Sequence, residues 1–452
     1  MLRSIVKPLA APAGSDRPPG PGSPHRIFKS FVFHIRPRMV AERTLRFSLT
    51  FGLGGTAAVL VALQLLTGVL LKFAYEPNPA RAYDSLIRLQ EGFVFGQLVR
   101  NTHFWSANLL VAVLFLHGLR VFFTGAFRPP RRANWIVGLS LFVLVLAANL
   151  TGYLLPWDQL AYWATTVSLG MLEYIPAGGV HLQQWVMGGE RIGPATLRHF
   201  FALHTAVLPV VTVALMSYHF WRVRKAGGLV VPRTAHEAPE EKPAMVASNP
   251  NLLLREAAVA LAVVSLVLAA ALLFDAPLGA PANPGLSPNP TKAPWYFAGI
   301  QEMLMHFHPA LAMLIVLALT LAAFFIPPFL PGAIGAPGVW FTSAVGRRSA
   351  AAGGAAAALL TPAAVVLDER VVDFSAGMPG LPPVIRSGLV PAALFLAVLA
   401  GVYFLVKKGI RAPRTEAVQA VFAFLAVMFV ALTLICAMFR GEGMALRWPG
   451  VG

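Results

Sequence analysis

The sequence predicts an all-α polytopic membrane protein, in which a four-helix bundle is followed by about five further transmembrane helices, nine in all. Hydrophobic residues make up 57% of the 452 residues and charged residues only 12%, a balance outside the range of soluble domains. There are 36 Lys and Arg against 19 Asp and Glu, giving a net charge of +17. These basic residues lie in short loops beside apolar segments, a sign of membrane topology and not of nucleic-acid binding. We therefore expect a lipid membrane around the protein and no nucleic-acid partner.

Nine apolar segments are each close to the ~20 residues needed to cross a bilayer. They cover residues 47–74, 102–124, 135–156, 201–222, 252–274, 305–326, 345–367, 387–406 and 416–438. The seventh is the weakest, because it is rich in Ala and Gly and contains Pro362. With nine spans, four basic clusters lie on one side of the membrane: 128–132, 222–225, 347–348 and 407–414. With eight, the last cluster would face outward, against the positive-inside rule. We expect a cytoplasmic N-terminus.

Five regions follow from these spans. They are an N-terminal tail and interfacial helix (1–45), a four-helix domain (46–225), a polar cytoplasmic linker (226–250), a C-terminal domain of three spans (251–411) and an extra C-terminal span (412–452). The extra span is a candidate docking site for another subunit. The single cysteine, Cys436, excludes an internal disulfide and any site built from several cysteines.

Two of the first four spans carry paired histidines. His103 and His117 are 14 residues apart, so they return to nearly the same helix face about 21 Å apart along the axis. His204 and His219 are 15 apart. These two spans run in the same direction, so we expect His103 to face His204 near the outer surface and His117 to face His219 near the inner surface. Each pair could hold one haem iron.

The extra residue in the second pair would turn one ligand by roughly 100°, which a haem accommodates by turning about its normal. A lone histidine in an apolar helix is more often a hydrogen-bonded core residue. However, intramembrane ionisable residues are functional candidates, and two matched pairs favour ligands.

Glycines in the first and third spans repeat the histidine spacing. They are Gly54 and Gly68, and Gly138 and Gly152, each pair 14 residues apart. A position without a side chain lets a flat macrocycle approach the backbone; the alternative is ordinary helix packing. Arg100 and Arg120 lie three residues outside His103 and His117, where a guanidinium could bind haem propionates. The alternative for both arginines is snorkelling to the membrane interface.

Two aromatic segments belong on the outer surface. One is GYLLPWDQLAYWATTV at 152–167, which is amphipathic and interrupted by Pro156. The other is the Pro-rich loop after the fifth span, which ends in Pro294-Trp295-Tyr296-Phe297. Together they would close over the outer haem and form an apolar, aromatic pocket with few polar groups, which suits a lipid quinone.

Taken together, these residues resemble cytochrome b of the quinol-oxidising bc-type complexes, in a fused long form whose N-terminal half is similar to the photosynthetic bf-type. The resemblance covers about residues 40–330. It rests on LQLLTG at 63–68, LHGLRVFFTGAFRPP at 116–130, GYLLPWDQ at 152–159, FFALHTAVLP at 200–209 and HFWRVRKAG at 219–227, and on the two histidine spacings.

The resemblance implies a quinol oxidoreductase subunit in a bacterial inner membrane. Residues 46–225 would hold two non-covalent b haems on the four histidines, and residues 251–411 a quinone site. Quinol would be oxidised near the outer surface, with one electron passing to a Rieske-type iron–sulfur or c-type cytochrome partner. The other electron would cross through the haems to an inner quinone site, coupled to proton translocation. A homodimer is implied too, and menaquinone is one candidate quinone.

Departures from the family pattern affect the predicted sites. The family's Pro-Glu-Trp-Tyr motif reads Ala293-Pro294-Trp295-Tyr296 here, so a carboxylate is missing. Glu302 is the candidate replacement, with Asp158 and His306 as weaker ones, beside Trp295 and Tyr296 in the quinol site.

Two further positions concern the haems and the inner site. Gly52 stands where the bf-type has the cysteine of an extra haem, so we predict no covalent haem. Arg224 and Lys225 could hold haem propionates or a quinone, or could simply anchor the helix by the positive-inside rule.

Two other functions remain open. A di-haem membrane anchor of a quinone-linked dehydrogenase would use the same histidines, but usually has four or five spans. A nine-span transporter with a histidine proton relay would leave the glycine pairs unexplained and would show no haem absorption.

Overall fold

The computed structural model describes residues 37–175, 177–232, 243–329, 338–341, 343–374 and 377–447. Over these residues the chain is almost entirely helical, with one small antiparallel sheet of two strands. Nine helical segments in this part are long and apolar enough to cross a membrane. The predicted all-α polytopic fold with nine spans is confirmed.

The first half of the chain contains four of the nine spans. In order, its elements are β1 (Met39–Ala41), the 3-10 helix η1 (Glu42–Leu45), α2 (Phe47–Thr50), α3 (Leu53–Lys72), α4 (Ala82–Gly92), α5 (Gly96–Phe123), α6 (Arg132–Leu154), α7 (Gln159–Gly170), the 3-10 helix η2 (Met171–Tyr174), α8 (Gly179–Met187), α9 (Pro194–Ala202), the π-helix η3 (Leu203–Val207) and α10 (Leu208–Lys225). The segments α9, η3 and α10 are continuous and form the fourth span, Pro194–Lys225.

The second half contains the other five spans. Its elements are β2 (Met245–Ala247), α11 (Ser248–Leu273), α12 (Trp295–His306), α13 (Pro309–Phe329), α14 (Ala344–Leu367), the π-helices η4 (Asp368–Val372) and η5 (Val384–Leu389), α15 (Val390–Gly409), α16 (Arg414–Phe439) and the 3-10 helix η6 (Glu442–Met444). The weakest predicted span, the seventh, is α14 with η4, and Pro362 lies inside α14.

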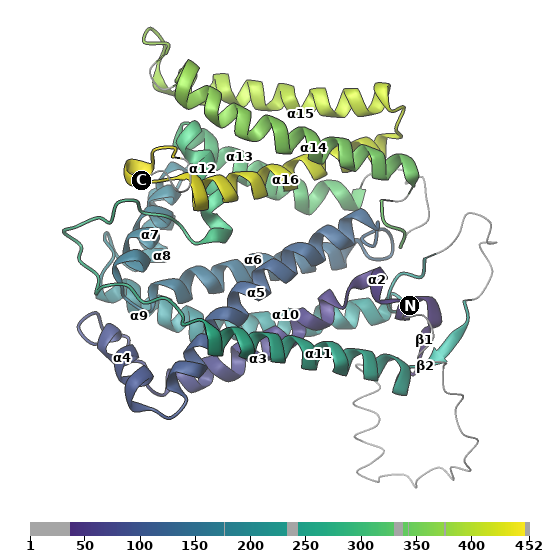
Figure 1. Cartoon of the computed structure of the whole chain (residues 1–452), viewed down its shortest axis with the longest axis horizontal. Coiled ribbons are helices and arrows are strands. Elements are labelled where there is room, and N and C mark those ends of the chain that lie inside the picture. The colour runs from purple at the N-terminus through teal and green to yellow at the C-terminus, as the bar shows by residue number, and fades with distance from the viewer. Residues whose placement is uncertain are drawn as a thin grey trace.

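The long helices lie roughly side by side in two groups (Figure 1). In one group, α3 packs on α5, α6 packs on α5 and α10, and α11 covers α3 and α5. In the other, α16 packs against α12, α14 and α15. The short helices α4, α7, α8 and α9 lie at one end of the molecule and the β1–β2 sheet at the other (Figure 1). The first end is the outer side of the predicted topology.

The predicted N-terminal tail and interfacial helix cover residues 1–45, of which residues 1–36 lie outside the described part. Residues 39–41 form a strand, not a helix, because residues 245–247 of the linker pair with them: Val40 lies opposite Val246. Ser248 completes this connection, since its hydroxyl donates to the Pro37 carbonyl oxygen at 2.6 Å. The start of the first domain is thereby joined to the start of the second.

Small residues in α14 allow α14 and α16 to pack closely. A Cβ added at Gly353 would lie 2.2 Å from the Ala420 carbonyl oxygen, so the two backbones are nearly in contact. This explains the Ala- and Gly-rich composition that made the seventh span a weak prediction, since small residues are how helices approach closely in a membrane. The ninth span, α16, is therefore an internal part of the C-terminal half.

Replacing Gly353 with Ala should lower the midpoint of thermal unfolding by a few degrees, because the added Cβ would push α14 away from α16. Overpacking of this kind costs about 1–3 kcal/mol. The matched control is Gly401→Ala in α15, where no atom lies within 4 Å of an added Cβ. Thermal unfolding of the detergent-solubilised protein measures both variants, and equal midpoints would contradict this account of the packing.

Candidate functional site

The four histidines of the bundle lie in two pairs at two depths. The structure places His103 of α5 beside His204 of η3, with ring centroids 6.1 Å apart and ring planes at 80°. His117 and His219, the second predicted pair, lie farther along the same two spans, beside Gly54 and Gly138 respectively. The space between the rings of the outer pair suits one metal ion with two nitrogen bonds of about 2 Å each.

Hydrogen bonds from neighbouring helices orient the outer imidazoles. The Thr67 hydroxyl donates to the Leu63 carbonyl oxygen at 2.6 Å, so it accepts from His103 Nδ1 at 2.8 Å. His204 Nδ1 donates to the Ala148 carbonyl oxygen at 2.9 Å. With Nδ1 protonated on both rings, each Nε2 presents a lone pair. This is the arrangement found in metal-ligating histidines, whose second nitrogen donates to a neighbouring acceptor.

Each predicted glycine faces one of the histidines. The distance from an added Cβ to the nearest imidazole atom, Cε1 in every case, is 3.5 Å for Gly54 and His117, 3.4 Å for Gly68 and His103, 3.3 Å for Gly138 and His219, and 2.5 Å for Gly152 and His204. The first three distances are tight or ordinary contacts, whereas the last leaves no room for any side chain. The glycines therefore make space for the imidazoles themselves, and clearance for a macrocycle stays a prediction.

A π-helix accounts for the unequal histidine spacing. His204 lies in η3, a single turn of π-helix that holds one residue more than an α-helical turn. Pro209 follows in the next turn and has no N–H with which to continue the α-helical pattern. The extra residue between His204 and His219 is thus absorbed locally. The expected rotation of one ligand by roughly 100° is replaced by this bulge.

At the inner depth, buried polar atoms lack partners. Arg120 Nε donates to the Leu49 carbonyl oxygen at 3.0 Å. Within the described residues, Arg120 Nη2 and His219 Nδ1 are buried and have no hydrogen-bond partner. Buried donors are nearly always satisfied in native proteins. These two buried nitrogen atoms without partners therefore indicate a polar ligand at the depth of His117 and His219.

The other predicted basic residues lie in different surroundings. Arg100 is buried and donates to the carbonyl oxygens of Ala276 and Pro277, both at 2.7 Å, so it holds the loop after α11 and does not snorkel. Arg224 is half-buried at the end of α10. Lys225 is exposed, with its ammonium 5.6 Å from the centre of the Trp221 ring.

The two aromatic outer segments lie against each other. The backbone N–H of Gln159 donates to the Ala280 carbonyl oxygen at 2.8 Å, and the Asp158 carboxylate accepts from the backbone N–H of Gly279 at 2.9 Å. The other oxygen of Asp158 caps α7 by accepting from the Ala161 amide at 2.8 Å. Both oxygens of Asp158 are thus engaged with the backbone. This carboxylate therefore fixes the loop against the start of α7.

Trp295 and Tyr296 face different surroundings. Trp295 lines an apolar cavity of 580 Å³, together with Phe104, Trp105, Asn108, Leu273, Phe274, Asp275 and Pro277. Its indole N–H donates to Asn108 Oδ1 at 2.7 Å. Tyr296 instead packs into the bundle core, where burial raises the pKa of its hydroxyl. An aromatic cavity of this size with two polar side chains has the character of a small-molecule site.

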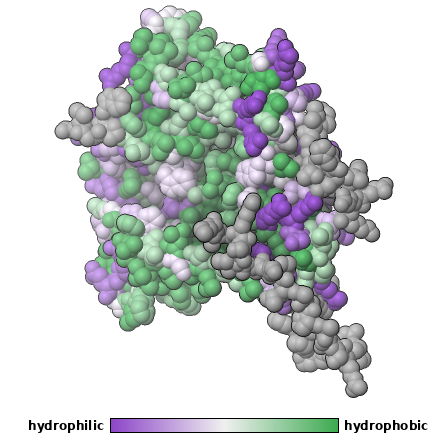
Figure 2. Space-filling model, turned by 45° about the vertical axis from the view of Figure 1, so that its right-hand side comes forward, coloured by the Kyte–Doolittle hydropathy of each residue, from purple (hydrophilic) through white to green (hydrophobic). Residues whose placement is uncertain are grey.

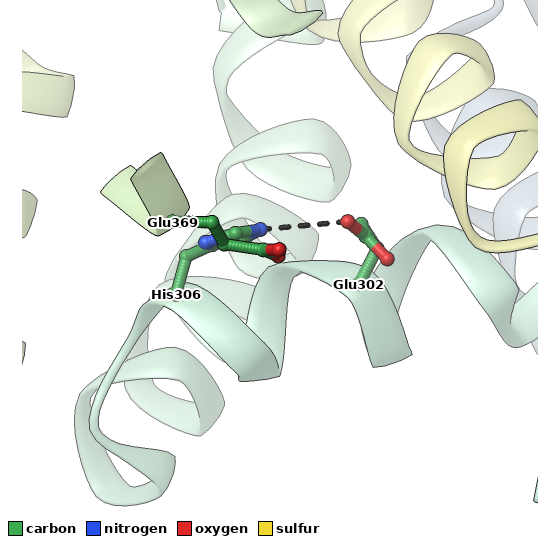
Figure 3. Close-up of side chains that lie close together, drawn as sticks. All are labelled: Glu302, His306 and Glu369. Carbon is green, nitrogen blue, oxygen red and sulfur yellow. Dashed lines mark hydrogen bonds and ion pairs between the residues drawn. The ribbon is translucent and has the colours of Figure 1, made fainter. Parts of the chain in front are cut away.

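Glu302 lies in a buried cluster of charged side chains (Figure 3). It is fully buried and forms an ion pair with Arg440, which follows α16; Arg440 Nε lies 2.9 Å from Glu302 Oε2. His306 Nε2 is 3.4 Å from Glu302 Oε1, and His306 Nδ1 is 2.6 Å from Asp368 Oδ2. Arg440 also pairs with Glu369. Glu302 is thus not an exposed interfacial carboxylate.

Comparison with known proteins identifies the bundle. Residues 41–227 match the family model described as cytochrome b/b6/petB. The chain is 42% identical over 175 residues to a cytochrome b6 of Synechococcus sp. (strain JA-3-3Ab), covering 39% of this chain and 81% of that protein. It is 40% identical over 202 residues to the menaquinol:cytochrome c reductase cytochrome b subunit of Geobacillus thermodenitrificans, covering 44% of this chain and 90% of that protein. The chain belongs to the cytochrome b/b6 family.

A solved structure extends the likeness to the whole fold of this cytochrome b. A chain of a hyperthermophilic respiratory Complex III superposes with a TM-score of 0.64 at 22% identity, covering 91% of this chain and 97% of that one. Membership of the family implies that the chain binds haem b. The residues present fit that group, since both outer imidazoles present Nε2 and the inner depth holds open polar atoms.

Several residues of the site were not identified from the sequence. Asn108 and Asp275 in the cavity, and Arg440, Asp368 and Glu369 around Glu302, come together only through the fold. Arg440 is 138 residues from Glu302, and Asp368 is 62 residues from His306. The sequence did offer one signal for this cluster. The acidic pair Asp368-Glu369 lies at the end of one span, and Arg440 lies at the end of another.

Replacing Gly152 with Ala should lower the haem b content of the purified protein. The added Cβ would stand 2.5 Å from His204 Cε1 and push the ring away from His103. Loss of ligand support weakens metal binding about 10–100-fold. The matched control is Gly55→Ala in α3, where nothing lies within 4 Å of an added Cβ. A pyridine haemochrome assay gives the haem content, and equal values in both variants would contradict the steric role of Gly152.

Proposed function

We propose that this chain is the cytochrome b subunit of a bc-type complex that oxidises quinol near the outer surface. Electrons then pass through two non-covalent b haems to a quinone site on the inner side, coupled to proton translocation. The observation that carries this proposal is the facing pair of His103 and His204, with a glycine against each of the four histidine rings. When bound, the haems supply one-electron carriers on the path across the membrane.

The chain's own residues would hold the haems. His103 and His204 are the ligands of the outer haem, and His117 and His219 those of the inner haem. Arg120 is the best candidate for a propionate contact, because one of its buried donors is open. Arg100 is less suited, since both of its terminal nitrogens already bind backbone carbonyls. Arg224 and Lys225 are proposed at the inner quinone site, where their charges would attract an anionic ring oxygen.

The cavity beside Trp295 is the proposed quinol site. Its aromatic walls would pack against the quinone ring, while Asn108 would orient the indole of Trp295. Tyr296 would support this site from the bundle core, and Asp158 would hold the loop that closes it. Glu302, seven residues after Trp295 on α12, is the proposed proton acceptor. These two residues share one side of the helix, about 10 Å apart along its axis.

The proposed partners are a Rieske-type iron–sulfur protein and a c-type cytochrome, in a homodimeric complex of a bacterial inner membrane. The menaquinol:cytochrome c reductase among the relatives supports this assignment and favours menaquinol as the donor. The chain is an integral, multi-pass membrane protein. The positions of the basic clusters support a cytoplasmic N-terminus, which is part of the proposal.

The decisive test of the haem arrangement is a redox-titrated visible spectrum of the purified protein, with a pyridine haemochrome count. His103→Ala and His219→Ala should each remove one of two b haems, and a different one, because each variant deletes a ligand at a different depth. A wild-type protein without haem, or variants that keep both haems, would return the histidines to core residues. A di-haem anchor would show the same spectrum but no quinol:cytochrome c activity in its complex.

Replacing Asn108 with Leu should raise the KM for quinol about 5–10-fold, because the cavity loses a polar group and the Trp295 indole loses its acceptor, a contact of about 1 kcal/mol or more. Haem content should not change. Asn251→Leu in α11 is the matched control, since the Asn251 side chain donates to the carbonyl oxygen of Ala247, the N-cap residue of that helix. Steady-state kinetics of the complex decide the matter, and an unchanged KM would place quinol elsewhere.

A further inference from the structure

The charged cluster around Glu302 joins three segments at the outer end of the C-terminal half. It consists of Glu302 and His306 from α12, Asp368 and Glu369 from η4, and Arg440 after α16. The family match ends at residue 227, long before any of them. Burying charged groups costs several kcal/mol per ion unless they are well paired. A cluster of five beside the helix that carries Trp295 therefore calls for a functional explanation.

The position of the cluster follows from the direction of the spans. The basic residues Arg347 and Arg348 mark the cytoplasmic start of α14, and Arg414 that of α16. Asp368 and Arg440 follow the opposite ends of the same helices. The cluster therefore lies on the outer side of the membrane, the side on which the proposed quinol oxidation releases protons.

Exposure increases along one line of hydrogen bonds in the cluster. The Glu302 side chain has no exposed surface, that of His306 is 11% exposed and that of Asp368 is 16% exposed. Glu302 Oε1 lies 3.4 Å from His306 Nε2, and His306 Nδ1 lies 2.6 Å from Asp368 Oδ2. The imidazole thus has a carboxylate on each side, one closed to solvent and one open to it. Figure 3 shows the ring turned toward Glu302.

A metal ion is a poor alternative occupant of this cluster. One ligand atom each from Glu302, His306 and Glu369 lies within 4.8 Å of the others, which is a spacing that could suit a cation. However, the Arg440 guanidinium binds both of those glutamates. This cation already neutralises the carboxylates that a metal ion would need.

We propose that Glu302, His306 and Asp368 form a proton-transfer chain that carries a quinol proton to the outer surface, with Arg440 as the positioning residue that orients the Glu302 carboxylate. The proposal rests on the proposed function, in which Glu302 accepts that proton. It adds the route by which the proton leaves and a role for the ninth span, which supplies Arg440.

The step balances as follows. A quinol O–H bond breaks and its proton binds a carboxylate oxygen of Glu302, while the electrons leave to the acceptors of the proposed function. His306 starts as an imidazolium with a proton on each nitrogen. Its Nδ1 proton passes to Asp368 and then to water, the remaining proton moves from Nε2 to Nδ1 by exchange, and Nε2 then accepts the proton from Glu302. One proton enters the proton-transfer chain and one leaves it. Glu302 and Asp368 end ionised, and His306 is again an imidazolium.

The charges of the cluster prepare both ends of the chain. Burial raises the pKa of Glu302, but hydrogen bonds from His306 and Arg440 outweigh it, so the net pKa lies below the usual value and the carboxylate is ready to accept. Burial lowers the pKa of His306, but hydrogen bonds to Asp368 and Glu302 outweigh it and raise the pKa to about 9. Near neutral pH His306 is therefore an imidazolium, and the proton on its Nδ1 can pass to Asp368.

The test measures kcat of the complete complex, purified from membranes, with a short-chain quinol as donor and cytochrome c as acceptor. His306→Gln and Asp368→Asn keep the side-chain sizes but cannot relay a proton, so each should lower kcat about 10-fold or more, since a positioned acid or base contributes 10²–10⁴-fold. The solvent isotope effect should rise in both. Glu442→Gln, at an exposed ion pair with Arg447, is the control and should stay within about twofold of wild type.

Arg440 is tested by the pH dependence of kcat. Because Glu302 must be ionised to accept a proton, activity falls as the pH drops through the pKa of Glu302. In Arg440→Gln the buried carboxylate loses its cation, its pKa rises, and the acid limb of the profile should move to higher pH by about one unit or more. Arg440→Lys retains the charge and should move the limb less. A purely structural arginine would lower activity evenly at every pH.

Spectra recorded on the same samples distinguish a failure of the proton-transfer chain from a failure of the proposed function. If the wild-type complex binds haem and oxidises quinol while His306→Gln and Asp368→Asn keep the wild-type rate and isotope effect, the proton chain is wrong and the proposed function stands. If the wild-type haems are not reduced by quinol, the proposed function fails and the proton-transfer chain fails with it. Lower kcat with unchanged haem spectra supports both.

Discussion

The contact between a glycine and an imidazole sets the geometry on which the N-terminal bundle depends. Each ring needs a neighbouring backbone close enough to leave no void, yet free of a side chain that would displace it. At Gly152 the available space is so small that a Cβ would stand 2.5 Å from His204. These contacts fix how closely α3 approaches α5, which carries His103 and His117, and how closely α6 approaches the span that carries His204 and His219. The close packing of the helices therefore also sets the positions of the histidine rings.

In the C-terminal half the main constraint is the burial of charged side chains where α12 meets the ends of two long helical segments. Breaking a buried ion pair by removing one partner typically costs about 3–5 kcal/mol, so Glu302 and Arg440 hold α12 to the end of α16 whatever else they do. Close packing of α14 on α16 brings Glu369 and Asp368 to the same place. The ninth span thus completes the environment of the helix that carries Trp295.

The sequence allowed prediction of what depends on local spacing. The spans follow from apolar length, and the pairing of His103 with His204 from helix periodicity and an odd number of crossings. Features that depend on distant segments could not be found this way. The contact of Asp158 with Gly279 joins residues 121 apart in the sequence, and the Glu302 cluster depends on three segments: α12, η4 and the residue after α16. The π-helix at His204 is local, but the apolar pattern of a span does not distinguish it from an α-helix. The strand at residues 39–41 could not be predicted either, because its partner lies in the linker.

One helix connects the haem bundle to the proposed quinol cavity. On α5, His103 faces the bundle, while Phe104, Trp105 and Asn108 line the cavity. His103 and Asn108 are separated by five residues, about 7.5 Å along the axis. Asn101, on the same helix, accepts from the Ala276 amide at 2.8 Å and fixes the loop that forms the far wall. A donor bound in the cavity and an acceptor held by His103 would thus be positioned by one rigid element, which favours a short and constant separation between them.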